Sequence, residues 1–170
     1  DDDVWRVGWN MGGGGGQRGG GAAGGVRGGG ERLCSRGSGP GPREVAFTCG
    51  ATHGLNLRRE GRLRPGDRVV TSPMEHNAVL RPLRQLGRAG VEVESLPGTE
   101  RGELVTENLA ERLTPGVRAV GLTHASNVSG TVFPIAEVGR LCRARGIFLL
   151  VDAAQTLGVL PVDMGAMGID

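Results

Sequence analysis

The sequence predicts an α/β fold, a three-layer α/β/α sandwich in which helices cover both faces of a mostly parallel sheet. From residue 43 onward, strand-like and helix-like runs alternate along the chain, as in repeated βα units. Residues 147–151 (IFLLV) are all apolar, which is typical of a central parallel strand covered on both faces. Gly- and Pro-containing turns, such as Pro65-Gly66-Asp67, separate the runs.

The predicted elements follow one another as strand, helix, strand through the chain. Residues 77–89 form a helix because their apolar side chains recur at helical spacing. Pro134 marks the start of a later helix and Gly146 its end. Strands are predicted over residues 44–48, 68–72, 91–96, 117–123 and 147–151, and helices over residues 52–60, 77–89, 105–113 and 134–146. Right-handed crossovers between parallel strands then place helices on both faces of the sheet.

Residues 1–42 and 43–170 differ in composition and are interpreted as separate regions. The first region is Gly-rich and lacks an apolar period, so it cannot bury enough surface to offset its ordering entropy and is expected to be disordered. An RNA-binding tail of the RGG type is the alternative, because Arg-Gly-Gly occurs twice in this region. Such tails interleave stacking aromatics, and here Trp5 and Trp9 are the aromatic residues nearby.

Charge and cysteine content exclude several classes of protein. The net charge of +2 predicts no strong attraction to nucleic acid or to a membrane surface. The three cysteines, Cys34, Cys49 and Cys142, lack metal-ligand spacing and are interpreted as free thiols in a reducing compartment. No apolar run is long enough to span a membrane, and the first residues do not resemble a signal peptide, so a cytoplasmic location is expected.

Polar clusters follow the predicted strands, at the edge where parallel α/β sheets bind ligands. Residues 48–52 form a small-residue turn that opens a helix, where free N–H groups and the Thr52 hydroxyl could bind a phosphate. An ordinary helix cap is the alternative there. His76 stands at a strand-to-helix junction and could stack on a ligand or exchange protons, or it could simply cap the helix.

Two further clusters lie after the last two predicted strands. Residues 123–131 form a polar loop suited to orienting a ligand, or merely to being solvated. Asp152 ends a strongly apolar strand, where an unpaired carboxylate is costly. A protonated ring nitrogen of a cofactor is one partner that would offset this cost, and a capped turn is the alternative. Clusters at one edge of one sheet support one another as a ligand site.

Four blocks of the sequence together resemble the class V aminotransferase family, in its cysteine desulfurase and selenocysteine lyase branch. The resemblance runs from about Arg43 to Asp170. It implies the large domain of the fold-type I transferases that depend on pyridoxal 5′-phosphate (PLP). The blocks are EVAFTCGATHGLNL, DRVVTSPMEHNAVLRPL, THASNVSGTVFPIAEVG and VDAAQTLGVLPVDMGAMGID.

The resemblance implies a PLP-binding role for six residues. Ala51 and Thr52 match the phosphate-binding turn, with the Thr52 hydroxyl as donor. His76 matches the histidine that stacks on the pyridine ring and assists proton transfer, which makes it the catalytic candidate. Metal ligands are not expected.

The other three positions lie after the later strands. Asn127 matches the asparagine near the phenolic oxygen of PLP and the substrate carboxylate. Asp152 matches the aspartate that pairs with the pyridinium nitrogen, and Gln155 the glutamine that binds the phenolic oxygen. A carboxylate beside the ring nitrogen keeps it protonated, so that PLP can act as an electron sink.

The implied activity is removal of sulfur from L-cysteine, giving alanine and an enzyme persulfide. The resemblance also implies a homodimer and a sulfur-acceptor protein. The family's Schiff-base lysine and persulfide cysteine have no counterpart among these residues, so we expect an incomplete part of the enzyme that is inactive alone. The alternatives are another class V enzyme, such as an aminotransferase or epimerase, and a non-catalytic fragment. A nucleotide-binding Rossmann domain is disfavoured, because residues 48–52 lack the G-x-G-x-x-G turn.

Overall fold

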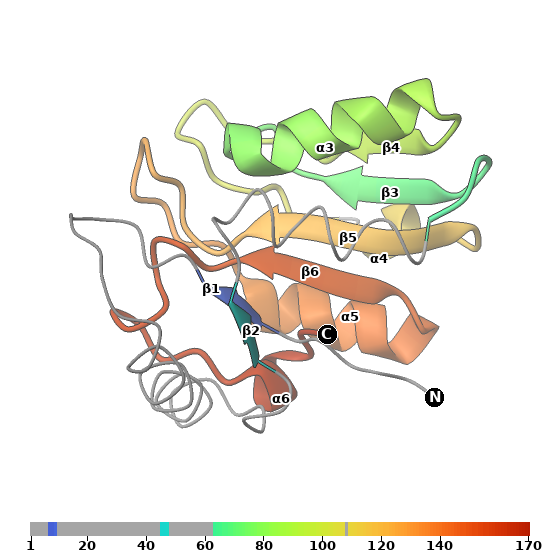
Figure 1. Cartoon of the computed structure of the whole chain (residues 1–170). Coiled ribbons are helices and arrows are strands. Elements are labelled where there is room, and N and C mark those ends of the chain that lie inside the picture. Colours follow the sequence, from blue (N-terminus) through green and yellow to red (C-terminus); the bar gives the residue numbers. More distant parts are fainter. Residues whose placement is uncertain (1–6, 10–44, 48–62, 108) are drawn as a thin grey trace, which may run out of the picture.

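Four parallel strands form the central sheet in the computed structural model, which describes residues 7–9, 45–47, 63–107 and 109–170 (Figure 1). The strands are β3 (Arg68–Thr71), β4 (Glu92–Ser95), β5 (Val117–Thr123) and β6 (Phe148–Asp152). They lie in the order β4-β3-β5-β6. Pairing aligns Val70 with Val120, and Val120 with Leu149, so the centre of the sheet is entirely apolar.

A second, two-stranded sheet pairs β1 (Val7–Trp9) in parallel with β2 (Val45–Phe47). β2 corresponds to the strand predicted over residues 44–48. β1 lies inside the Gly-rich region, of which no other residue is among those described. The predicted helix over residues 52–60 and the Arg-Gly-Gly repeats also lie outside the described residues.

One face of the four-stranded sheet is covered by α3 (Asn77–Arg88). Valine and leucine side chains of α3 pack on the sheet because they recur along one side of the helix. The core on this face consists of Val69, Val79, Leu83, Leu86, Val91 and Ala119, with Leu63 and Phe148 packed against it.

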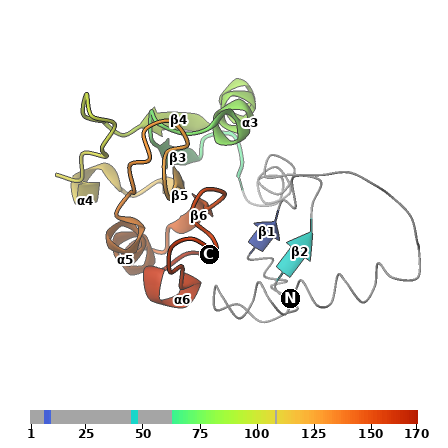
Figure 2. The same ribbon diagram turned by 90° about the vertical axis from the view of Figure 1, so that its left-hand side faces the viewer.

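The opposite face is covered by α4 (Leu109–Arg112), α5 (Ile135–Arg145) and α6 (Met164–Met167). Figure 2 shows α3 on one side of the sheet and α4 and α5 on the other. Neighbouring residues of β3 serve different cores, since Val69 packs under α3 and Val70 packs on the opposite side. The predicted three-layer α/β/α fold is confirmed. Among the described residues, no helix is long and apolar enough to cross a membrane.

The connections out of β3 and β5 run in opposite directions. β3 leads through α3 to β4 on one side, whereas β5 leads through α5 to β6 on the other side and across the opposite face. The carboxyl ends of the adjacent strands β3 and β5 are therefore a topological switch point, where open parallel sheets bind ligands. The ligand-binding site is therefore expected at the carboxyl ends of β3 and β5.

Most predicted elements that fall on described residues agree with the structure to within a residue or two, and β1, α4 and α6 are the exceptions. β1 was not predicted, because residues 1–42 were expected to be disordered. The helix predicted from residue 105 begins only at Leu109, because the Val105 N–H bonds the carbonyl oxygen of Pro97 (3.1 Å). This segment forms a loop held by the bridge between Gly98 and Leu104. The short helix α6 was not predicted; the Asp163 side chain caps its first turn.

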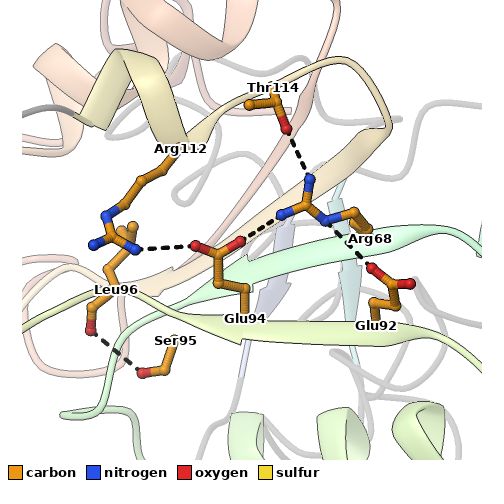
Figure 3. A network of polar contacts seen from close by, with 7 residues as sticks. All are labelled: Arg68, Glu92, Glu94, Ser95, Leu96, Arg112 and Thr114. Carbon is orange, nitrogen blue, oxygen red and sulfur yellow. Dashed lines mark hydrogen bonds and ion pairs between the residues drawn. The ribbon is translucent and has the colours of Figure 1, made fainter.

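An ion-pair network fastens the edge strand β4 to its neighbours (Figure 3). The Glu94 carboxylate lies between two guanidinium groups, 2.6 Å from Arg68 and 3.1 Å from Arg112. Arg68 also contacts Glu92 (3.4 Å) and donates to the Thr114 hydroxyl (2.7 Å). Ion pairs of this kind protect an edge strand from unwanted pairing.

Candidate functional site

His76 lies at the switch point, in the turn between β3 and α3. It is the N-cap residue of α3, and its ring Nδ1 accepts a hydrogen bond from the Ala78 N–H (3.1 Å). The capping alternative from the sequence is thus realised, and it has a chemical consequence. Because Nδ1 is an acceptor, a neutral ring carries its proton on Nε2, and the ring orientation is fixed by the helix start. The side chain remains exposed.

Asp152 is the last residue of β6 and is only partly exposed. It is paired with Thr123 of β5, which brings it beside the switch point. One carboxylate oxygen, Oδ1, accepts from the Ala154 N–H (3.0 Å) and so caps the turn that follows. The capping alternative and a ligand-binding role are compatible here, because a carboxylate has two oxygens and several lone pairs.

Asn127 and Gln155 project from turns that leave the ends of β5 and β6. Asn127 is exposed in a turn held by Ser126, whose hydroxyl oxygen accepts from the Val128 and Ser129 N–H groups (3.2 and 3.3 Å). Gln155 is exposed in the turn closed by the bond from Thr156 N–H to the Ala153 carbonyl (3.0 Å). Each amide is therefore presented by a hydrogen-bonded turn.

Glu75 is a buried carboxyl group at the switch point, 6% exposed, and sequence reasoning missed it. Its Oε1 accepts from the Ser72 hydroxyl (2.6 Å) and from the Thr123 N–H (2.8 Å), so it joins the ends of β3 and β5. Burial, the largest effect, raises the pKa of Glu75 to about 7; the charge of Asp152 acts in the same direction, and the two hydrogen bonds oppose it. A polar residue directly after a buried strand was the available signal.

A second buried polar pair joins the loops after β5 and β6. The His124 ring Nδ1 lies 2.9 Å from the Thr156 hydroxyl, and both residues are almost fully buried. Burial lowers the pKa of His124. The neutral ring therefore holds the turn that carries Gln155 against the loop that carries Asn127.

Four of the six predicted site residues are among those described, and all four lie at one edge of the sheet: His76, Asn127, Asp152 and Gln155. In the described part of the chain, hydrogen bonds join the segments that bear these four residues. One bond links Glu75 to Thr123, and another links His124 to Thr156. Ala51 and Thr52 lie outside the described residues.

Cys142 faces the core below α5 and is fully buried, as its place on an apolar stripe predicts. Burial is the main cause that raises the pKa of its thiol to about 12, and the charge of Asp170 adds to it. Since the thiolate is the nucleophile in sulfur chemistry, Cys142 is a structural residue.

Comparison with known sequences agrees with this architecture. The family model of the class V aminotransferases matches residues 39–170. Cysteine desulfurase IscS of Klebsiella pneumoniae and that of Escherichia coli strain K12 / DH10B are each 39% identical over 136 residues, which are 78% of this chain and 34% of the relative. The chain thus spans about a third of the length of these relatives.

Solved structures share the fold. The apo structure of the cysteine desulfurase from Thermococcus onnurineus NA1 superposes with a TM-score of 0.81 at 28% identity, covering 92% of this chain and 40% of that chain. The structure of SspA in complex with cysteine gives 0.80 at 29% identity, with 88% and 44% covered. These agreements confirm the predicted family. Since the family model also covers most of the sequence, the chain belongs to the class V aminotransferases.

Proposed function

We propose that these residues form the cofactor-binding part of a PLP-dependent cysteine desulfurase. In this reaction the Cβ–S bond of L-cysteine breaks, a sulfur–sulfur bond forms to an enzyme cysteine, and the substrate carbon takes up a proton to become alanine. The observation that carries the proposal is the gathering of an imidazole, a carboxylate and two amides at the switch point of a fold shared with cysteine desulfurases. L-Cysteine is favoured as substrate because the sequence relatives are desulfurases.

The residues present fit PLP. Asp152 keeps one oxygen hydrogen-bonded to the chain and is partly exposed, as a partner for a cationic ring nitrogen must be. His76 offers a ring of fixed orientation that can stack on a pyridine. Bound PLP supplies an electron sink for the amino acid's α-carbon. Asn127 and Gln155 would donate to oxygen atoms at the ring and the substrate, and the Nε2 proton of His76 is available for transfer.

Residues Ala51 and Thr52 would bind the cofactor phosphate in this proposal, following the resemblance of their turn. We also propose a homodimer and transfer of sulfur to an acceptor protein. Sedimentation of the protein would test the dimer.

PLP binding can be measured directly on the 170-residue chain. Free PLP is achiral, so a circular dichroism signal in its absorption band reports binding. This chain contains no lysine, so we expect reversible binding rather than attachment through a lysine side chain. Asp152→Asn should weaken binding about tenfold or more, by analogy with the loss of a charge-assisted hydrogen bond. Glu100→Gln, an exposed carboxylate in another loop, is the control.

Activity separates the desulfurase from its alternatives. An enzyme that contains these residues together with the Schiff-base lysine and the persulfide cysteine should form alanine and sulfide in equal amounts when it is incubated with PLP, L-cysteine and a thiol reductant. The 170-residue chain alone should form neither product. Alanine formation by these residues alone would contradict their expected inactivity. Amino transfer to a 2-oxo acid without sulfide would instead identify an aminotransferase. An absence of induced dichroism in the chain would argue against the proposed PLP site.

A further inference from the structure

Glu75 spans the switch point with a hydrogen-bond arrangement that uses only one of its oxygens. Oε1 receives the Ser72 hydroxyl from the end of β3 and the Thr123 N–H from the end of β5. The next residue in the chain is His76, whose backbone carbonyl begins α3. The Glu75 carboxyl group therefore connects the turn that orients the His76 ring to the end of β5.

The other oxygen, Oε2, is fully buried and has no hydrogen-bond partner in the described structure. An ionised carboxylate buried with one oxygen unpartnered is costly, whereas the neutral carboxyl group avoids the buried charge at the smaller cost of one hydroxyl group without an acceptor. Oε1 can accept both of its hydrogen bonds in the neutral form as well as in the ionised form. The geometry thus favours a proton on Oε2.

Asp152 of β6 is the charged group in the described structure whose field acts on Glu75, since Ser72 and Thr123 are neutral donors. Two neighbouring carboxyl groups resist being ionised together. Asp152 is the better exposed of the pair, and it has the Ala154 N–H to stabilise its charge. Burial raises the pKa of Glu75 to about 7, in the same sense.

We propose that Glu75 is a positioning residue that acts as a neutral carboxyl group, tying the β3–α3 turn that bears His76 to the end of β5 and leaving Asp152 as the ionised carboxylate of the site. The value of this arrangement for PLP rests on the proposed function, whereas the protonation of Glu75 does not. The neutral Glu75 carboxyl group holds the β3–α3 turn through its hydrogen bonds without placing a second negative charge beside the site.

Carbon-13 NMR of the labelled glutamate carboxyl groups, recorded on the chain without cofactor, tests the protonation. The Glu75 resonance, identified by its loss in Glu75→Gln, should titrate with a midpoint near 7 rather than near the ordinary 4.5. Asp152→Asn should lower that midpoint while leaving it raised, because burial is the larger cause. Glu100→Gln is the matched control and should leave it unchanged. A midpoint near 4.5 would overturn the proposal.

Two further signals test the positioning role. The Thr123 amide and the Met74 amide, whose N–H bonds the Ser72 hydroxyl in the β3–α3 turn, should shift with the Glu75 midpoint in the wild-type chain. In Glu75→Gln, which keeps an acceptor but cannot ionise, both amide resonances should stay near their low-pH wild-type positions at all pH values. Glu75→Leu, which has no acceptor, should displace both. If neither resonance shifts as Glu75 titrates in the wild-type chain, the positioning role is contradicted.

The two proposals fail in different ways. A chain whose Glu75 titrates near 7 but that gives no PLP dichroism contradicts the proposed function alone. A chain that binds PLP while Glu75 titrates near 4.5 contradicts this inference alone.

Discussion

At the scale of single residues, the site depends on polar groups that are almost fully buried. His124 and Thr156 illustrate this, because their hydrogen bond joins two loops that the backbone alone would leave independent. Glu75 does the same between β3 and β5. The exposed residues proposed to contact the cofactor are therefore held by a layer of buried, hydrogen-bonded side chains behind them.

Thr156→Val should cost about 1–3 kcal/mol of unfolding free energy, because it leaves the buried His124 Nδ1 without its partner while conserving the side-chain volume. Thr156→Ser retains the hydroxyl group and should recover most of that loss. Urea unfolding monitored by circular dichroism gives both values. Equal stability of Thr156→Val and wild type would show that the hydrogen bond contributes nothing.

At the scale of elements, α5 and α6 approach so closely that a side chain cannot fit between them. A Cβ atom on Gly139 of α5 would overlap the carbonyl oxygen of Met167 and lie 3.2 Å from the Gly168 Cα. Gly168 ends α6 with a φ of 69°, a left-handed conformation that favours glycine. The contact places Ile169 in the core, next to the final bond from the Asp170 N–H to the Leu149 carbonyl (3.0 Å).

Gly139→Ala should therefore destabilise the chain by about 1–3 kcal/mol, because α6 must shift to admit the methyl group. Gly87→Ala is the matched control, since it lies in α3 with open space around it. That substitution should stabilise the chain by about 0.5–1 kcal/mol through the lower helix propensity of glycine. Urea unfolding compares the two variants. Similar stability for both would mean that α5 and α6 do not pack as closely as described.

The elements that sequence reasoning located best are those whose signal is local. The strand over residues 117–123 matches β5 because an apolar run bounded by turns needs no partner to be recognised. α4 was predicted too long because a distant bond, from Val105 N–H to Pro97, decides where it begins. α6 was missed because its four residues depend on packing against Gly139. Tertiary contacts of this kind are not visible in periodicity.

The site, like the fold, could be predicted where the signal is local and not where it depends on tertiary contacts. The strand-end rule located His76 and Asp152, since both stand directly after strands that are apparent from the sequence. It did not distinguish Glu75 from His76 beside it, although one is buried and the other exposed. That difference depends on the end of β5, which lies 48 residues further along the chain.

At the scale of the whole molecule, the four-stranded sheet separates two hydrophobic cores. Every proposed site residue in the described structure lies at one edge of this sheet, where the strands have their carboxyl ends. The opposite directions of the β3 and β5 connections create that edge, and two buried titratable groups, Glu75 and His124, lie beside it. Their pKa values shift in opposite directions, up for Glu75 and down for His124. The stability of the whole chain should therefore depend on pH in two opposing ways.

The sign follows from which state binds the proton more tightly. Glu75 has a pKa of about 7 when folded against 4.5 as an ordinary glutamate, so the folded chain holds its proton longer. Its contribution to stability falls as pH rises from about 4.5 to about 7, by about 3 kcal/mol in all. His124 has a folded pKa below the ordinary 6.5, so the unfolded chain takes up that proton first. Its contribution falls as pH drops below about 6.5.

Urea unfolding between about pH 5 and pH 8 should separate these contributions. In wild type, the Glu75 and His124 contributions to the unfolding free energy change with pH in opposite directions below about pH 6.5. Just above that pH, the change comes largely from Glu75. Glu75→Gln should abolish the decline near pH 7 and leave a stability that falls only on acidification. His124→Gln should leave the opposite profile, with stability highest near pH 5 and lowest above 7. If wild type and Glu75→Gln keep parallel profiles across pH 7, Glu75 carries no proton in the folded chain, and the charge pattern assigned to this edge of the sheet is wrong.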